Sequence, residues 1–257
     1  MERQIEKMCW ELAMGASKRF ERFADGWVLR VNGVWIHGYH FGLNDAAAAA
    51  ICDDKAATSE VLGKTKLPVV PHWFLSREQM PDVSGLLTEY GALVVKPNEG
   101  TGGRDVLRVS SEIELSLALE RLLADYERLS VSPYVEVETE FRVIVLRGEP
   151  VLIYAKKQPA EGWLFNLGQG AVPEVLYSGA SGRGISSGQV AKLAEIAVSA
   201  CARLGLLFAS VDLVLSREQH ELLILEVNSG VMLEHFSRLS DGNYALAKTV
   251  YQLALGL

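Results

Sequence analysis

Hydrophobic residues recur about every three to four positions in four long segments, a spacing that places them on one face of an α-helix. We therefore predict amphipathic helices at residues 2–23, 111–128, 189–205 and 244–255. Ser111 can cap the second of these helices, and Glu114 supplies the acid of a capping box.

Shorter segments also favour helix. Asn44 can cap a helix over residues 45–52, where an alanine run favours helix because alanine loses almost no side-chain entropy there. Residues 54–62 predict a further short helix that ends near Gly63, and residues 76–90 predict a connection that contains a helix.

Runs of β-branched and aromatic residues between turn residues predict strands, several of them paired in hairpins. Asn32-Gly33 is the strongest hairpin turn signal. The paired runs are residues 27–31 with 34–36, 141–146 with 151–157, and 208–215 with 222–228. Single strands are predicted at residues 69–75, 93–95, 106–109 and 132–137, and a polar, glycine-rich loop at 158–188. This mixture favours an α+β fold with antiparallel sheets over a doubly wound parallel sheet.

The composition is that of a globular protein with a sizeable core, because 49% of the 257 residues are hydrophobic and 22% are charged. Such a length accommodates one large domain or two lobes. The net charge of −7 argues against broad affinity for nucleic acid or membranes, although it leaves room for a local basic pocket. The widely spaced Cys9, Cys52 and Cys201 form neither a disulfide framework nor a zinc pattern, so we expect reduced thiols in a cytoplasmic protein. The chain lacks the uninterrupted apolar run of a signal peptide or a membrane span.

The most distinctive polar segment is a glycine-rich loop at residues 96–106, which lies between two predicted strands. Glycines let backbone amides approach a polyanion closely, and Lys96 adds a positive charge, so the segment is suited to hold phosphate. It is not a Walker A loop, because no Gly-Lys-Ser/Thr follows the glycines. Nor is it a dinucleotide fingerprint, because it leads into a strand rather than a helix. We interpret it as a flap that folds over a nucleotide.

A second polar group lies on two consecutive apolar strands near the C-terminus. Glu226 and Asn228 are two residues apart and therefore face the same way, and folding the hairpin brings Asp212 opposite Glu226. Charges in such runs are costly unless they are paired or bind a metal, and oxygen ligands suit Mg²⁺. The alternatives are a buried acid with an arginine partner or a strand that faces solvent. We favour the metal.

The lysine, the glycine flap and the two acid strands, in this order, resemble the ATP-grasp superfamily from about residue 53 to the C-terminus. Within it, three segments resemble the ribosomal-protein glutamate ligases and related carboxylate–amine ligases, namely residues 140–145, 166–171 and 226–230. The resemblance implies an ATP-grasp fold, in which two α+β lobes clamp the nucleotide. The implied divisions are a shortened N-terminal region at residues 1–52, a first lobe with the flap at 53–131, and a second lobe with the metal site at 132–257.

The family's residue roles carry over where this sequence matches its motifs. The implied phosphate contacts are Lys55 and Lys96. The implied flap residues are Glu99, Gly100, Thr101, Gly102, Gly103 and Arg104. The implied adenine-binding hinge consists of Tyr134, Val135, Glu136 and Val137, and the implied ribose contact is Glu140. The implied Mg²⁺ ligands are Asp212, Glu226 and Asn228. The implied catalytic residues are Arg142, beside the transferred phosphate, and Lys156 and Asn166, near the reacting carboxylate.

The resemblance implies an ATP- and Mg²⁺-dependent ligase, with Mn²⁺ as an alternative metal, that joins a carboxylate and an amine through an acyl phosphate. Its substrates would be an amino acid, a peptide or a related small molecule, without nucleic acid or membrane partners, and a homodimer stays open. An ATP-grasp kinase or phosphotransferase would use the same phosphate and metal site. A noncatalytic nucleotide-binding protein is a third alternative, against which the full set of polar site residues weighs.

Overall fold

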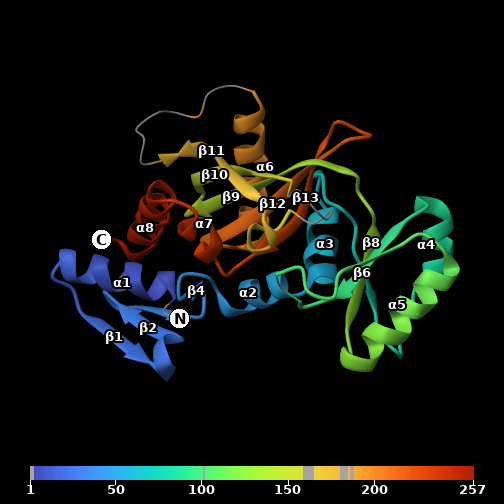
Figure 1. Ribbon diagram of the computed structural model, residues 1–257, viewed down its shortest axis with the longest axis horizontal. Coiled ribbons are helices and arrows are strands. Elements are labelled where there is room, and N and C mark those ends of the chain that lie inside the picture. Colours follow the sequence, from blue (N-terminus) through green and yellow to red (C-terminus); the bar gives the residue numbers. More distant parts are fainter. Residues whose placement is uncertain (1–2, 101, 159–164, 180–184, 186–187) are drawn as a thin grey trace.

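Three antiparallel sheets follow one another along the long axis of the molecule (Figure 1). The computed structural model describes residues 3–100, 102–158, 165–179, 185 and 188–257. Every pair of neighbouring strands in the three sheets is antiparallel, which confirms the predicted α+β class. No helix in this described part is long and apolar enough to cross a membrane.

The N-terminal segment folds as one helix and a small sheet. Helix α1 (Gln4–Gly15) precedes a sheet with the order β1-β2-β3-β4. The strands are β1 (Phe20–Phe23), β2 (Val28–Val31), β3 (Val34–His37) and β4 (His40–Phe41). The β2–β3 turn is the predicted one, with positive φ at Asn32 (48°) and Gly33 (83°). The predicted helix at 2–23 was wrong beyond Gly15: the chain turns at Ser17 (φ 53°), and Phe20–Phe23 pair with β2.

Two short helices, α2 (Ala46–Asp53) and α3 (Lys55–Gly63), connect this sheet to the rest of the molecule. The cap of α2 is Asp45, which accepts hydrogen bonds from Ala47 N and Ala48 N, so the prediction of Asn44 as the cap was wrong. Asn44 instead binds a distant strand, where its amide oxygen accepts from Leu207 N and Phe208 N. Asn44 is 163 and 164 residues away from these two partners in the sequence. The local sequence pattern could therefore not predict the contacts.

The second sheet in chain order, which we call the middle sheet, lies at the end of the molecule opposite the N-terminal sheet (Figure 1). It carries the flap and has the strand order β5-β8-β6-β7. The strands are β5 (Trp73–Leu75), β8 (Leu129–Pro133), β6 (Leu93–Pro97) and β7 (Leu107–Val109), and helices α4 (Val83–Tyr90) and α5 (Glu112–Asp125) belong to the same unit. The helices share a core with one face of the sheet, through residues such as Leu93, Leu122 and Val131. Ser111 caps α5 as predicted, but the Glu114 carboxylate accepts from Ser110 N rather than from the cap residue.

Two strand predictions around this sheet were too long. In the segment predicted at 69–75 only Trp73–Leu75 joins the sheet, while Val69 makes an isolated bridge to Ile224 of another sheet. In the segment predicted at 132–137, β8 ends at Pro133 and the next strand begins at Val137. Residues 134–136 connect the two sheets and belong to the predicted hinge.

The large sheet has the order β11-β10-β9-β12-β13. Its strands are β11 (Val172–Ser178), β10 (Glu149–Lys157), β9 (Val137–Leu146), β12 (Phe208–Ser216) and β13 (Leu222–Asn228). The remaining helices are α6 (Gln189–Leu204), α7 (Glu234–Arg238) and α8 (Asp241–Leu255), and a short 3₁₀ helix, η2, covers Leu167–Gln169. The predicted loop at 158–188 was wrong in part, because β11 and η2 lie within it. The glycine-rich surroundings had obscured strand β11, which pairs with β10.

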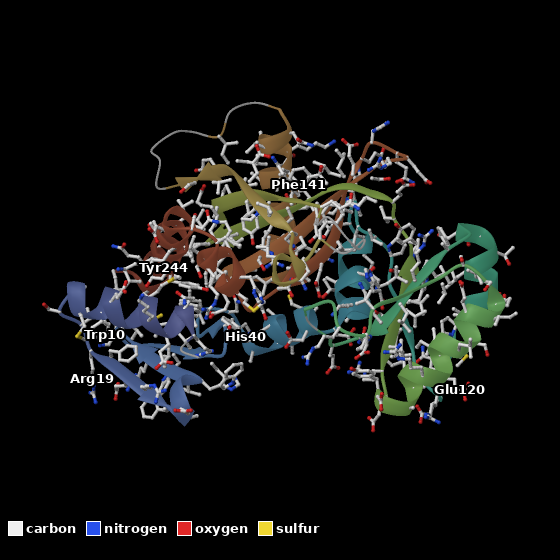
Figure 2. The ribbon with its side chains drawn as sticks, viewed as in Figure 1. Trp10, Arg19, His40, Glu120, Phe141 and Tyr244 are labelled. Carbon is white, nitrogen blue, oxygen red and sulfur yellow. The ribbon has the colours of Figure 1, made fainter. Side chains whose placement is uncertain are left out.

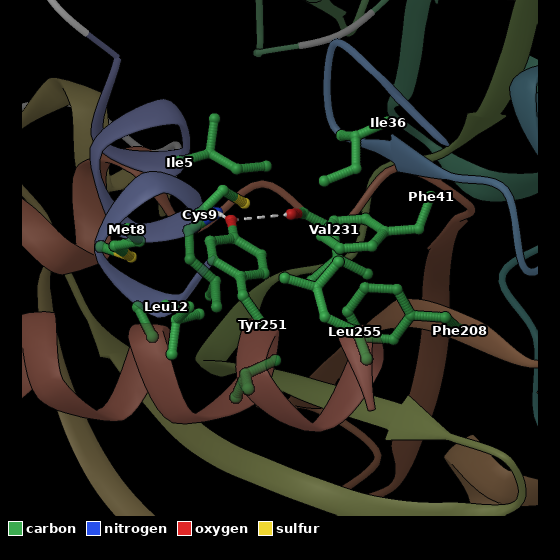
Figure 3. Packing of buried hydrophobic residues seen from close by; sticks show 14 of the residues in the cluster. Ile5, Met8, Cys9, Leu12, Ile36, Phe41, Phe208, Val231, Tyr251 and Leu255 are labelled. Carbon is green, nitrogen blue, oxygen red and sulfur yellow. Dashed lines mark hydrogen bonds between the residues drawn. The ribbon is translucent and has the colours of Figure 1, made fainter. Parts of the chain in front are cut away.

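Each face of the large sheet has its own core. Helix α6 packs on one face together with residues of α2 and α3. On the other face, α8 packs against α1 and the N-terminal sheet (Figure 3). There Tyr251 donates a hydrogen bond to Val231 O at 3.1 Å and accepts one from Leu233 N at 3.2 Å. The N-terminal segment is therefore part of the layer that covers this sheet.

Candidate functional site

A cavity of about 440 Å³ lies between the middle sheet and the large sheet. Its size is that of a pocket for a small ligand. Its walls come from the flap, the hinge, α3 and the acid strands. Twelve of the predicted site residues line it: Lys55, Lys96, Gly100, Gly102, Gly103, Arg104, Tyr134, Val135, Glu136, Val137, Glu140 and Glu226.

Two lysines project from different elements to this cavity. Lys96 is on β6, and neither a hydrogen bond nor an ion pair joins its ammonium to any residue that the structure describes. Burial lowers the pKa of Lys96 to about 8, although the Glu226 carboxylate acts to raise it. Lys55, the first residue of α3, donates to Gly100 O at 2.5 Å and lies 3.1 Å from Glu226 Oε1. One lysine is thus held by the protein, and the other is unpaired and costly to keep charged.

The flap is anchored at both ends. Gly102 and Gly103 have positive φ values of 72° and 71°, which glycine adopts without strain. Asn166, which precedes η2, donates from its amide to Gly102 O at 2.8 Å and thereby links the second lobe to the flap. Glu99 does not line the cavity; its carboxylate lies 2.6 Å from Arg128, which also binds Asp54 at 2.7 Å. The predicted flap residue Thr101 lies outside the described residues.

The hinge offers a mixed polar and apolar wall. The carbonyl oxygen of Glu136 accepts from Arg217 N at 2.8 Å, whereas the backbone of Val135 makes no such bond to a described residue. The Arg108 guanidinium lies 4.0 Å from the centre of the Tyr134 ring, a cation–π contact. Sequence reasoning missed Arg108, Arg217 and the apolar wall, which consists of Val94, Val106, Phe165, Val214 and Leu225. A spacing of two from a predicted residue on the same strand was the available signal for Val94, beside Lys96 on β6, and for Val214, beside Asp212 on β12.

A buried ionic network lies on the large sheet beside the cavity. Arg142 is opposite Asp212 in the register of β9 and β12 and donates to both carboxylate oxygens, at 2.8 and 2.7 Å. Lys156 binds Asp212 at 2.9 Å and also pairs with Glu140. Burial alone would raise the pKa of Asp212, but the Arg142 and Lys156 charges hold it well below its usual range. Burial also raises the pKa of Glu140, against the lowering effect of Lys156.

The three predicted metal ligands occupy unequal environments. Glu226 lies opposite Asp212 in the register of β12 and β13, lines the cavity and is partly exposed. Asp212 is only 3% exposed and accepts four hydrogen bonds, the fourth from the Asn228 amide at 3.3 Å. A carboxylate has about four acceptor positions, so those of Asp212 are filled in this arrangement. Among the described residues no group of three or more His, Cys, Asp or Glu side chains forms a metal site.

The predicted residues therefore form two adjacent groups. The cavity collects the phosphate, flap and hinge residues with Glu226, whereas Arg142, Lys156, Asp212 and Asn228 form the network behind it. Beyond the network, Ser229 Oγ lies 3.2 Å from Nδ1 of His40, at the point where the N-terminal sheet meets α2 (Figure 2).

The fold and this cavity define the class of protein. Residues 52–251 match the family model of the RimK-like ATP-grasp domain, so the chain belongs to the RimK-like ATP-grasp family. A curated relative, a probable alpha-L-glutamate ligase from Legionella pneumophila (strain Corby), is 28% identical over 211 residues, which cover 80% of this chain and 64% of the relative. The chain thus spans less than two thirds of that relative's length.

Solved structures show the same fold. The D-alanine–D-alanine ligase from Bacillus anthracis has a TM-score of 0.62 and 18% identity, with 82% of this chain and 70% of that chain covered. The ATP-grasp ligase PsnB, solved with a phosphomimetic precursor variant, Mg and ADP, has a TM-score of 0.58 and 18% identity, with 84% and 62% covered. The predicted ATP-grasp fold is confirmed.

Proposed function

We propose that this protein is an ATP- and Mg²⁺-dependent carboxylate–amine ligase that forms an amide bond through an acyl phosphate. The observation that carries the proposal is the cavity itself. It brings Lys55 and Lys96, the glycine flap, the hinge and Glu226 around one nucleotide-sized space in a chain of the RimK-like ATP-grasp family. We also propose the lobe division at residues 53–131 and 132–257, with the cavity between the lobes.

The nucleotide would lie with its phosphates at the lysines and its base at the hinge. Lys96 is unpaired, and a triphosphate would supply the negative charge that its buried ammonium lacks. Flap amides at Gly102 and Gly103 would add hydrogen bonds to phosphate oxygens. At the other end, the unbonded backbone of Val135 is available to the base edge, and Val214 and Leu225 provide an apolar wall.

The metal ligands proposed for Mg²⁺ are Glu226, Asp212 and Asn228, with Mn²⁺ as an alternative ion. The donor set fits, because all three can offer oxygen atoms, and the carboxylate of Glu226 lines the cavity. Asp212 would have to exchange one of its present hydrogen bonds, of which the 3.3 Å bond from Asn228 is the longest. When bound, the ion neutralises phosphate charge.

The residues of this chain would then position the reactants and exclude water. Phosphoryl transfer from ATP to a substrate carboxylate forms the acyl phosphate, and an amine displaces the phosphate to form the amide. We place Arg142 at the phosphate end of the nucleotide. Because Asp212 holds its guanidinium, the charge of Arg142 would need no reorganisation during transfer. Asn166 ties the flap down through Gly102, which would protect the acyl phosphate from hydrolysis. Lys156 would act through Asp212 and Glu140.

The substrates are proposed to be an amino acid or peptide. The name of the Legionella pneumophila relative specifies glutamate, so glutamate is the first amine to test. A cytoplasmic location is proposed because ATP is its co-substrate.

The test measures ADP release with pairs of carboxylates and amines, beginning with glutamate as the amine, and the mass of the product. A ligase forms ADP in amounts that match a product lighter by one water than the two substrates together. A product that instead carries a stable phosphate on a hydroxyl group would identify a kinase and refute the ligase.

The nucleotide site is tested by calorimetric titration of Mg-ATP. Glu226→Ala is expected to abolish turnover and weaken Mg-ATP binding, because it removes a carboxylate from the cavity wall. Glu174→Ala is the matched control, since it removes an exposed acid that pairs with Lys157 on the outer strands. Unchanged binding and turnover in Glu226→Ala would remove Glu226 from the metal site.

A further inference from the structure

A buried histidine behind the nucleotide cavity has one ring nitrogen without a partner. His72, which precedes β5, is 7% exposed, and its Nδ1 lies 2.9 Å from Val70 O. Because a carbonyl oxygen only accepts, Nδ1 carries the proton of this hydrogen bond. Nε2 is buried and has no hydrogen-bond partner among the described residues. Buried polar atoms are almost always satisfied, so this nitrogen requires an explanation.

His72 also lines a second, much smaller cavity of about 10 Å³. Most of its wall is apolar, and its polar members include Lys55, Ser59 and Glu226. Lys55, Leu225 and Glu226 line the small cavity and the nucleotide cavity alike. The two cavities therefore adjoin at the Lys55–Glu226 ion pair, and His72 lines the smaller one.

We propose that the small cavity binds one water molecule, which joins His72 Nε2 to the Lys55–Glu226 ion pair and makes His72 a positioning residue for Mg-ATP binding. The water site goes beyond the proposed function, and its effect on Mg-ATP binding rests on that function. The volume is about that of one water, and three polar partners match the number that a buried water typically has.

The protonation state of His72 determines which groups donate and which accept in this bridge. Burial lowers the pKa of His72 well below its usual range, and the nearby charges of Lys96 and Lys55 lower it further. The ring is therefore neutral, and Nε2 can only accept. The water can donate one hydrogen to Nε2 and the other to the Glu226 carboxylate. It accepts from the Lys55 ammonium in place of the 3.4 Å hydrogen bond that Lys55 otherwise donates to Asn98 O. All three groups are then satisfied, and the ion pair is fixed from behind.

The other contacts of Lys55 and Glu226 explain why a bridging water would stabilise their ion pair. Lys55 is drawn toward the flap by Gly100 O, and Glu226 is partly exposed to the nucleotide cavity. The remaining contact of the ammonium, with Asn98 O, is long at 3.4 Å, so a bridging water would hold the pair more firmly when the nucleotide leaves. A fixed pair presents the same geometry to each incoming nucleotide, which reduces the ordering cost of binding.

The first test is a crystal structure of the nucleotide-free protein. It should contain an ordered water within about 3.2 Å of His72 Nε2. An empty small cavity would overturn the proposal, whatever the nucleotide affinity.

The second test measures Mg-ATP affinity by calorimetry. His72→Leu removes the acceptor and should weaken binding about tenfold, whereas His72→Gln, whose amide oxygen can replace Nε2, should stay within about threefold. Thr58→Val is the matched control, because Thr58 lines the same cavity but its hydroxyl donates to Ile51 O; its affinity should not change. Thermal unfolding of each variant shows that the titrated protein is folded.

A double-mutant cycle separates positioning from general damage. In a Lys55→Met background, His72→Leu should have no further effect on affinity, because the ion pair that it positions no longer exists. A tenfold loss that persists in that background, or equal affinities of wild type and His72→Leu, would overturn the proposal. Wild-type protein that does not bind Mg-ATP would instead refute the proposed function, and the crystal structure would still decide the water site.

Discussion

Mg-ATP affinity is predicted to fall as the pH rises through the titration of Lys96. In the nucleotide-free protein, burial lowers the pKa of Lys96 from 10.5 to about 8, although the Glu226 and Glu140 charges act to raise it. No described residue forms an ion pair with its ammonium. Phosphate oxygens next to the ammonium favour its charged form and move its pKa back toward the ordinary value. Protonation and nucleotide binding therefore strengthen each other.

The magnitude follows from the pKa of about 8 without nucleotide and the ordinary value of 10.5, which we take for the bound state. Below about pH 7 nearly every molecule has a charged Lys96, so the affinity is constant there. At about pH 9 only about one molecule in eleven is charged, which raises the apparent dissociation constant about tenfold. The full difference of about 2.5 between the pKa values corresponds to about 3.4 kcal/mol and is reached above about pH 10.5. For folding the sign is opposite: the free energy of unfolding rises between about pH 8 and 10.5, where only the unfolded chain keeps the proton.

The assay is calorimetric titration of Mg-ATP from about pH 6.5 to 9.5, in buffers of different ionisation enthalpy. Binding should take up close to one proton per nucleotide near about pH 9. Lys96→Met is the matched control, since it should bind weakly with an affinity that does not depend on pH. Constant wild-type affinity between about pH 7 and 9, or the same pH slope in Lys96→Met, would refute the reasoning.

Two further predictions concern stability. Asp212→Asn should lower the free energy of unfolding, measured by urea titration, by about 3 kcal/mol or more, because Arg142 and Lys156 lose their shared buried counter-charge. A loss below about 1 kcal/mol would contradict this prediction. Since the pKa of Asp212 lies below its usual range, its stabilising contribution is complete above about pH 4 and is lost as the pH falls further. Gly230→Ala should cost about 1–3 kcal/mol, because an added Cβ would lie 2.9 Å from the His40 ring. The double variant with His40→Ala should recover most of the decrease in melting temperature. If it does not, the His40 ring is not the cause of the destabilisation.

Elements with strong local signals could be predicted from the sequence. Helices α5, α6 and α8 have sustained helical spacing, and the β2–β3 hairpin has a turn that only a few residue pairs favour. Strand β1 and strand β11 could not, because both depend on partners elsewhere in the chain: β1 follows a helix without a composition change, and β11 lies in glycine-rich surroundings. The hinge at residues 134–136 is likewise invisible locally, since its β-prone residues pass from one sheet to another.

The candidate site shows the same division. Motif spacing located the lysines, the glycines and the acid strands, because these residue types have few other uses in such patterns. It could not show that Glu99 pairs with Arg128, or that His72 lines a small cavity together with Lys55 and Glu226. Those relations depend on side-chain direction and on burial, which sequence spacing alone leaves open.

Asp212 and Glu226, on adjacent strands, were both predicted to bind the metal, but they differ in burial. Asp212 and Glu226 lie opposite each other, yet Asp212 is enclosed with two cations, whereas Glu226 faces the cavity with only Lys55. The sequence left a metal site and an arginine partner as alternatives for this cluster, and the structure contains the arginine partner at Asp212. A buried carboxylate between two cations is expensive to uncover, so a ligand is expected to engage Glu226 first and to reach Asp212 only by displacing the Asn228 amide. Metal affinity should accordingly depend more on Glu226 than on Asp212, although Asp212 matters more for stability.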